Sequence, residues 1–590
     1  MKQEITALRQ AMLAAGVDAY IIPTEDFHGS EYVGDYFKCR SYVSGFTGSA
    51  GTLVVTASDA LLWTDGRYFL QAADQLAGTG ITLMKMREPG VPTIEAWLGD
   101  HLTAGQTLGF DGRTMTAFAG RRYVKAAEKQ GAAVRFDRDL VGEIWENRPA
   151  RSMKEVWALD DACTGRTRRE KLSDLKAAVK EAGADAHVLA DLSDIAWLMN
   201  LRGNDVLCSP VFLSFFLLDG ENAYLYIDAE KVPDPIRASL AADGVALRPY
   251  ENIFADVAAL DGSRRVLLNP ATVSYALIGG VKGETVEKSN PTELPKAMKN
   301  ETEQKNAKAA HVKDGAALVR FLIWLKSHVG KEAITEISAA EKLESFRKAQ
   351  PGYLEPSFEP IFGYGPHGAI VHYSATPETD APLRPEGLLL FDTGSQFLEG
   401  TTDVTRTVAL GPVTDEMKRD FTMVLRGHLR LLAARFKKGC SGVSLDVLAR
   451  SPLWERGLDY NHGTGHGVGA LLNVHEGPQR IHYQAFSAPQ TLEPGMITSD
   501  EPGFYLEGQY GIRHESLLLC VKDAENEYGT FYRFEPLTMC PFDLDAILPE
   551  EMTEEERAVL NAYHKTVRET LSPVLDEDER RWLDAATRAI

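Results

Sequence analysis

The chain has 590 residues, with 63 Lys and Arg against 84 Asp and Glu, which gives a formal net charge of −21. Hydrophobic residues make up 44% and charged residues 25%, as in an ordinary globular protein. At about 150 residues per domain, the length indicates three or four domains. A sequence pI near 5.2 excludes nucleic acid or an anionic membrane as the expected partner, because phosphate groups need basic surfaces.

The cysteine content and the hydropathy favour a cytoplasmic protein. The six cysteines include no Cys-x-x-Cys pair, which excludes a disulfide scaffold or a zinc ribbon. Residues 1–14 contain no signal-peptide core, and no apolar run approaches the roughly 18 residues that span a bilayer. We therefore expect a reducing, cytoplasmic setting and no membrane partner.

The first residues predict a helix followed by a buried strand. Ile5, Leu8 and Met12 recur at helical spacing, and Gly16 follows them as a stop. The apolar run 19–22 then has the length and composition of a short buried strand.

The same pattern returns in the second quarter of the chain. A helical face at 172–179 precedes a strand-like run at 186–190. Two more strands are expected after each copy, at 53–55, 61–63, 212–218 and 224–227. We infer an internal duplication that gives two related α/β domains, at residues 1–150 and 151–300. Chance resemblance of two helix–strand units is the alternative.

The remaining sequence predicts a larger domain with a helical tail. An apolar face at 318–325 indicates a long helix near its start. We expect this domain at residues 301–535 and a C-terminal extension at 536–590. In the extension, Thr553 and Glu556 fit a capping box before a helix.

Acidic residues lie in two expected strands of the larger domain. A strand at 388–391 leads to Asp392, and another strand at 401–410 contains Asp403. A carboxylate is costly to bury unless a positive charge compensates it. Arg406 could pair with one of these two carboxylates, but not easily with both.

Three histidines and two more acids follow along the chain. His462, His466 and His475 stand among glycines, where the backbone can approach closely. Glu501 comes after a Pro-Gly turn, and Glu515 precedes an apolar strand.

Four of these acids and one histidine form a candidate metal site: Asp392, Asp403, His466, Glu501 and Glu515. Four converging negative charges repel one another, so that the set makes sense around cations. Five side chains with bridging carboxylates suffice for two divalent metal ions about 3.5–4 Å apart. Oxygen-rich ligation with one histidine favours Mn²⁺, with Co²⁺ and Zn²⁺ as alternatives. Taken singly, each residue could instead be a turn, surface or packed loop residue.

Five fragments carry a family resemblance. They are Phe-Asp-Thr-Gly at 391–394 with Thr-Asp-Val-Thr-Arg-Thr at 402–407, His-Gly-Thr-Gly-His-Gly at 462–467, Asn-Val-His-Glu-Gly-Pro at 473–478, Asp-Glu-Pro-Gly-Phe-Tyr at 500–505, and Gly-Ile-Arg-His-Glu at 511–515. They resemble the pita-bread metallopeptidases, and among these the long, three-domain Xaa-Pro aminopeptidases (aminopeptidase P). The resemblance implies an α/β and α+β architecture: two creatinase-type α/β domains, a pita-bread catalytic domain and a C-terminal helical extension.

The resemblance also implies how the metal site works. Asp392 would bind one metal ion, Asp403 and Glu515 would bridge both, and His466 and Glu501 would complete the other. A hydroxide between the two metal ions would attack the peptide bond, and Glu501 would take its proton.

Residues outside the metal site would hold the substrate. His372 and His475 resemble the histidines that bind the substrate and stabilise the tetrahedral intermediate. Arg67 would reach the substrate from the N-terminal domain. The pocket for the proline ring would be lined by His462, Tyr505 and Arg513.

The implied function is release of an N-terminal residue from peptides with proline in the second position, by a homodimer. Prolidase, which cleaves only dipeptides, is the nearest alternative. The five-ligand set argues against creatinase, which needs no metal, and the duplicated front argues against methionine aminopeptidase. A non-catalytic pita-bread binding module is a third alternative, and it would have lost ligands.

Overall fold

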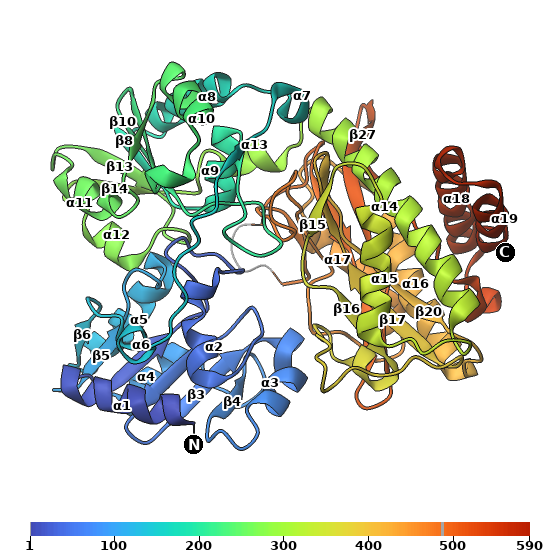
Figure 1. The fold of residues 1–590 in the computed structure, drawn as a ribbon, viewed down its shortest axis with the longest axis horizontal. Helices are drawn as coiled ribbons and strands as arrows, with labels where there is room; N and C mark the ends of the chain where they lie inside the picture. The colour runs from blue at the N-terminus through green and yellow to red at the C-terminus, as the bar shows by residue number, and fades with distance from the viewer. Residues whose placement is uncertain (1, 485–488) are drawn as a thin grey trace. The chain divides into compact units, whose positions relative to one another are not determined.

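The computed structural model describes residues 2–484 and 489–590, and the chain divides into two compact units (Figure 1). The first unit contains the chain up to Asp161 together with Arg166–Glu293. The second contains Ala162–Gly165 and Leu294–Ile590. Among the described residues, no helix is long and apolar enough to cross a membrane.

The first unit contains two six-stranded sheets. In spatial order, one sheet consists of β4 (Thr82–Lys85), β3 (Ala60–Thr64), β2 (Thr52–Thr56), β1 (Ala19–Ile22), β5 (Thr107–Phe110) and β6 (Ala133–Arg135). The other consists of β12 (Val245–Arg248), β11 (Asn222–Tyr226), β10 (Phe215–Asp219), β8 (Ala186–Leu189), β13 (Arg265–Leu268) and β14 (Glu284–Glu287).

The two sheets have the same topology. In one, β1 pairs antiparallel with β2 and parallel with β5. In the other, β8 pairs antiparallel with β10 and parallel with β13. The outer pairs match as well, since β3–β4, β5–β6, β11–β12 and β13–β14 are all parallel. Because order and direction agree strand by strand, the predicted pair of related α/β domains is confirmed.

Helices accompany both sheets of the first unit. Around the first sheet they are α1 (Gln3–Ala15), α2 (Cys39–Ser44), α3 (Phe69–Gln75), α4 (Ile94–His101), α5 (Ala117–Lys129) and α6 (Leu140–Ile144). Around the second they are α8 (Arg168–Glu181), α9 (Leu192–Met199), α10 (Asp234–Ala242), α11 (Asn252–Ala259) and α12 (Tyr275–Gly279). The predicted apolar face of α1 is buried, and Gly16 ends that helix with a φ of 65°.

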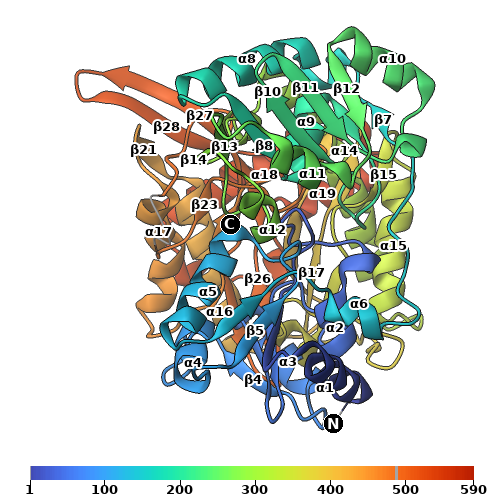
Figure 2. The same ribbon diagram turned by 90° about the vertical axis from the view of Figure 1, so that its left-hand side faces the viewer.

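The second unit places strands between helices. Its helices are α14 (Glu301–His328), α15 (Glu336–Lys348), α16 (Asp415–Leu432), α17 (Gly442–Trp454), α18 (Glu554–Leu571) and α19 (Glu577–Ala586). Within this unit, Figure 2 shows α15 and α17 on opposite sides of the strands. The apolar face predicted at 318–325 is buried in α14, and the predicted capping box of Thr553 and Glu556 begins α18.

The strands of the second unit form several small sheets. The largest has the order β21 (Arg435–Lys437), β28 (Gly529–Pro536), β27 (Ser516–Asn526) and β24 (Ile497–Asp500). The three-stranded sheets are β16 (Ile361–Tyr364)–β17 (Leu388–Thr393)–β20 (Val404–Ala409) and β15 (Tyr353–Pro356)–β18 (Ser395–Phe397)–β19 (Gly400–Thr401). The two-stranded sheets are β22 (Gly465–His466)–β23 (Arg480–Ile481) and β25 (Gly503–Leu506)–β26 (Tyr510–Arg513).

One predicted strand is divided in the structure. The segment 401–410 is not continuous, because β19 ends at Thr401 and β20 begins at Val404. Asp403 therefore lies in the break between two sheets rather than inside a strand. At this position the backbone of Asp403 belongs to neither strand. Its carboxylate faces His466, which lies in β22 of another sheet.

Candidate metal centre

The four acids of the candidate site lie at the ends or junctions of strands. Asp392 is in β17, and Asp403 directly precedes β20, which pairs with β17. Glu501 follows β24, and Glu515 lies between β26 and β27. Asp392, Asp403 and Glu515 are buried.

His466 joins the carboxylates from the short strand β22. Its Nε2 lies 3.5 Å from Asp403 Oδ2 and 3.5 Å from Glu501 Oε1. Its Nδ1 lies 3.0 Å from the carbonyl oxygen of Gly467, to which an Nδ1–H would donate. That hydrogen bond leaves the Nε2 lone pair directed at the carboxylates, the arrangement in which a histidine binds a metal ion.

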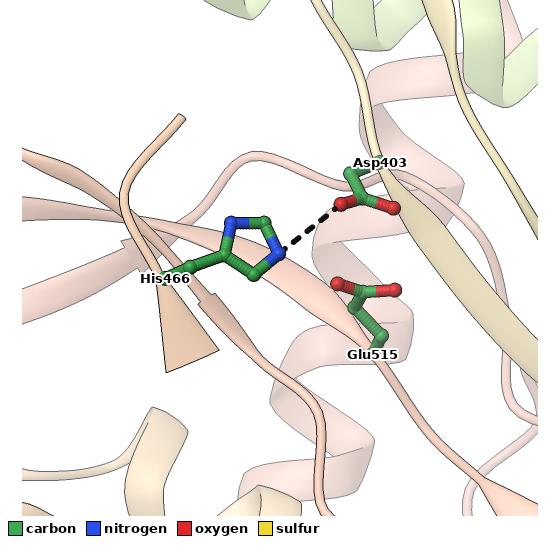
Figure 3. A group of neighbouring side chains, drawn as sticks. All are labelled: Asp403, His466 and Glu515. Carbon is green, nitrogen blue, oxygen red and sulfur yellow. Dashed lines mark ion pairs between the residues drawn. The ribbon is translucent and has the colours of Figure 1, made fainter. Parts of the chain in front are cut away.

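Figure 3 shows Asp403, His466 and Glu515 pointing toward one another from three segments. Each offers one ligand atom, and these atoms all lie within 4.8 Å of one another. The hydroxyl of Ser499 links His466 with Glu501, because it accepts from the backbone N–H of His466 and donates to Glu501 over 3.0 Å.

The donor set fits a divalent metal ion. Without a cation, burial and repulsion by the neighbouring acids hold the pKa of Asp403 and the pKa of Glu515 well above their ordinary values. Burial, with a contribution from Asp392, raises the pKa of Glu501 to about 7 although Arg513 opposes the rise. Oδ1 of Asp392 is buried and accepts no hydrogen bond from any residue that the structure describes. Oxygen ligands around one imidazole suit Mn²⁺ and similar ions.

A chain of hydrogen bonds runs from His462 to the metal centre. Nε2 of His462 lies 2.8 Å from the hydroxyl of Tyr505, and that hydroxyl accepts from Arg513 Nη1 over 2.8 Å. Arg513 is fully buried, and its Nη2 donates to Asp392 Oδ2 over 2.6 Å. The three residues that the resemblance implies for a proline pocket therefore form one connected group that ends on Asp392.

Sequence reasoning missed Thr405, which connects this group with Glu515. Its hydroxyl donates to Glu515 Oε2 over 2.8 Å and accepts from Arg513 Nε over 3.2 Å. The signal was present in the strand expected at 401–410, in which Asp403 and Thr405 are two residues apart and side chains at that spacing lie on one face.

The expectation for Arg406 is wrong. Its described hydrogen bonds go to backbone carbonyls and to two hydroxyl groups, and it pairs with neither Asp392 nor Asp403. The reason is direction: successive side chains of a strand point to opposite faces, so that Arg406 points away from the face of Thr405.

His475 lies in the site, and the loop that contains His372 packs beside it. The rings of His475 and His466 have centroids 4.3 Å apart at 71°. His372 lies in the turn after η4 (Gly365–Ala369). Its neighbours Ile370 and Tyr373 belong to an apolar cluster that includes Tyr505.

Arg67 lies in the first unit, in η2 (Gly66–Tyr68). Its guanidinium binds Asp65 through Nε and Nη2 over 2.9 and 2.8 Å, and Nη1 lies 3.1 Å from Glu31. These contacts fix its side chain within the unit, and its contact with a substrate stays a prediction.

Comparisons with known proteins cover almost the whole chain. The models of the creatinase/prolidase N-terminal domain match residues 5–139 and 147–303. The model of metallopeptidase family M24 matches residues 305–522, and that of the C-terminal region of peptidase M24 matches 530–590.

Full-length relatives agree with these matches. Aminopeptidase P1 of Arabidopsis thaliana is 37% identical, over 100% of this chain and 99% of the relative. A probable Xaa-Pro aminopeptidase P of Talaromyces marneffei is 39% identical, over 100% and 92%. The crystal structure of X-prolyl aminopeptidase from Caenorhabditis elegans, described as a cytosolic enzyme with a di-nuclear active site, is 34% identical with a TM-score of 0.95, over 100% and 99%. The chain therefore belongs to the Xaa-Pro aminopeptidase family of the M24 metallopeptidases, with two creatinase-type domains before a pita-bread catalytic domain and a C-terminal region.

Proposed function

We propose that this chain is a metal-dependent aminopeptidase that hydrolyses the bond between the first residue of a peptide and a proline in second position. The observation that carries the proposal is the convergence of buried Asp403 and Glu515 with half-buried His466, in a chain that matches Xaa-Pro aminopeptidases over its full length. Two divalent metal ions are the cofactors. We propose Mn²⁺ as the native metal because the donors are mostly oxygen.

The five proposed ligands divide between the two metal ions. Asp392 would hold one ion, His466 and Glu501 would hold the other, and Asp403 and Glu515 would serve both. Bound divalent ions lower the pKa of water and polarise the substrate carbonyl. The hydrogen bonds from Thr405 to Glu515 and from Arg513 to Asp392 would keep these two carboxylates in place for the ions.

The surrounding residues handle protons and substrate. Glu501 accepts the proton of the attacking water and passes it to the proline nitrogen. His372 and His475 donate hydrogen bonds to the oxygen that becomes negative in the tetrahedral intermediate. His462, Tyr505 and Arg513 line the pocket for the proline ring, and Arg67 contacts the substrate from the first unit.

The chemistry of the substrate explains why a dedicated enzyme is needed. An Xaa-Pro bond is a tertiary amide with no N–H, so that peptidases that bind that N–H cannot use it. A pocket that binds the rigid proline ring next to the metal centre can position the substrate without that hydrogen bond. The cluster of carboxylates also favours the cationic N-terminus of a peptide.

One assay separates this proposal from its alternatives. The purified protein is given Xaa-Pro peptides of two, three and more residues before chelation, after chelation and after addition of Mn²⁺. We expect cleavage of Arg-Pro-Pro, loss of it on chelation and recovery with Mn²⁺. Cleavage of dipeptides alone would favour prolidase, and a protein with no bound or activating metal would favour a non-catalytic binding module.

We further propose a cytoplasmic homodimer whose partners are peptides rather than nucleic acids or membranes. The acidic composition supports the exclusion of nucleic acid. Light scattering on the purified chain should give about twice its mass of 64.9 kDa.

A further inference from the structure

Arg406 is a fully buried cation with no carboxylate among its described partners. A buried guanidinium is costly unless hydrogen bonds satisfy its five N–H groups. The partners of Arg406 fall into two sets that are far apart in the sequence. One set surrounds the proposed metal ligand Glu515, and the other belongs to the C-terminal region.

The first set fixes the backbone of Glu515. Nη1 of Arg406 donates to the carbonyl oxygen of Glu515 and, over 2.9 Å, to that of Thr405. The N–H of Glu515 donates to the same Thr405 carbonyl over 3.0 Å. Glu515 lies between two strands, and Arg406 supplies a donor for its carbonyl. Both backbone polar groups of Glu515 are thus held against β20.

The second set ties Arg406 to the C-terminal region. Its Nη2 donates to the carbonyl oxygen of Cys540 over 2.7 Å and to the hydroxyl of Tyr563, in α18, over 2.8 Å. Nε lies 3.3 Å from the carbonyl oxygen of Pro541, and the guanidinium lies 4.0 Å from the centre of the Phe542 ring.

The hydroxyl of Tyr563 closes the network. It lies 2.9 Å from the carbonyl oxygen of Thr538 and 2.8 Å from that of Cys540, and it donates its single proton to one of them. It can therefore only accept from Arg406. Loss of this hydroxyl leaves Nη2 of Arg406 with the carbonyl oxygen of Cys540 and the more distant hydroxyl of Ser516, 3.3 Å away, and it frees the segment around Cys540.

We propose that Arg406 and Tyr563 are positioning residues through which the C-terminal region orients Glu515 in the metal centre. The proposal rests on the proposed function only in taking Glu515 as a metal ligand. Because the carboxylate direction follows from the Glu515 backbone, weakening the network turns the ligand without removing it. Outer residues of this kind typically change metal affinity by 10- to 100-fold.

The test compares Tyr563→Phe with Tyr532→Phe. Both tyrosines are buried, and each variant loses one hydroxyl. Tyr532 lies on β28, and among the residues that the structure describes its hydroxyl bonds Glu493 alone, over 3.0 Å. Metal affinity is measured by titration of the metal-free protein, and ligand geometry by the visible spectrum of the Co²⁺-loaded protein. We expect Tyr563→Phe to bind at least one ion about tenfold more weakly, with a changed spectrum. Tyr532→Phe should match the wild type.

Arg406→Lys is the second variant, because it keeps the charge but lacks the planar fork. We expect a larger loss of metal affinity than in Tyr563→Phe. Equal affinities and spectra for Tyr563→Phe, Tyr532→Phe and the wild type would overturn the proposal, even if Arg406→Lys fails to fold. If the wild type binds two metal ions but cleaves no Xaa-Pro peptide, the proposed function fails while the titration still decides the role of Tyr563.

Discussion

Thr405 and Thr407 show how one strand supports the metal centre at the scale of single atoms. Both are fully buried on the same face of β20. The hydroxyl of Thr405 bonds the side chains of Glu515 and Arg513. Among the described residues, the hydroxyl of Thr407 bonds the backbone of Arg513 alone, with the N–H and the carbonyl oxygen each 3.1 Å away. Thr405 thus supports a proposed metal ligand directly, whereas Thr407 supports the backbone of Arg513.

We predict that Thr405→Val weakens metal binding and peptide cleavage by about 10- to 100-fold, because Glu515 loses its hydrogen-bond donor. Valine keeps the shape of threonine, so that the loss is polar rather than steric. Thr407→Val is the control: each variant should lose about 1–3 kcal/mol of unfolding free energy, because each leaves buried polar groups unsatisfied. Titration with metal and denaturant melts measure the two effects. Equal metal affinity in both variants would contradict the prediction.

Asp403 provides a second prediction. Asp403→Asn removes a negative charge that faces His466 and Glu515, and it should reduce cleavage of Arg-Pro-Pro by more than the roughly 100-fold expected for an outer residue. Asp420→Asn is a control, since Asp420 is buried on α16 and accepts from the hydroxyl of Tyr510. Wild-type turnover in Asp403→Asn would refute the proposed ligand set.

The sequence allows the candidate ligands to be selected, but not the residues that support them. The candidates are the acids and histidine that stand in apolar or glycine-rich runs and whose spacing matches that of a known family: Asp392, Asp403, His466, Glu501 and Glu515. A side chain that donates to backbone carbonyls cannot be recognised from its partners in the sequence, since every residue has a carbonyl. The contacts of Arg406 with segments more than a hundred residues away were therefore outside the reach of motif reasoning.

At the scale of elements, prediction succeeded where periodicity is strong. The apolar faces of α1 and α14 and the capping box of α18 could be predicted because local spacing and local hydrogen bonds determine them. The break at Asp403 could not, because a change of sheet depends on partners elsewhere in the chain. The domain boundaries at residues 150, 300 and 535 stay predictions.

The loop that contains His372 is held by one buried carboxylate. Glu336, at the start of α15, accepts hydrogen bonds from the backbone N–H groups of Tyr364 and Ala381. The hydroxyl of Tyr373 donates to it over 3.0 Å, and Nδ1–H of His367 donates over 2.9 Å. All four donors lie in the segment 364–381, so that Glu336 organises the whole loop.

This loop should loosen as the pH rises. The hydrogen bond to Glu336 raises the pKa of His367 above 6.5. A raised folded-state pKa stabilises the protonated form, so that the contribution is complete below about 6.5 and is lost as the pH rises through the folded-state value. We predict faster hydrogen exchange in residues 365–381 at pH 8.5 than at pH 6, after correction for intrinsic rates. His367→Gln should remove the difference, and a difference that persists in this variant would assign it to another group.

At the scale of the whole molecule, two levels of organisation differ in how they could be inferred. The duplicated sheets of the first unit follow from a repeated order of short elements, which one sequence displays. The charge that the protein presents to solvent cannot be obtained by counting its ionisable residues, because four of the 84 acids belong to the candidate metal centre. A net charge of −21 treats these four as independent solvated groups, and the burial of Asp392, Asp403 and Glu515 contradicts that treatment.

Metal removal should therefore make the free energy of unfolding fall as the pH rises, and the metal-bound protein should not show this fall. In the metal-free protein, burial raises the pKa of Glu501 to about 7, and the pKa values of Asp403 and Glu515 are also raised. Between pH 4.5 and about 7 the folded state then binds more protons than the unfolded state, and stability falls as pH rises. Bound divalent ions compensate the charges and remove this slope.

We predict that the gain in melting temperature on adding Mn²⁺ is larger at pH 8 than at pH 5.5, measured by calorimetry at saturating metal. The metal-free protein should lose stability over this interval, while the loaded protein changes less. In Asp403→Asn the slope of the metal-free protein should shrink, because one of the repelling charges is gone. A gain that is equal at both pH values would contradict the prediction, because it would mean that the carboxylates are already compensated by groups of the protein itself.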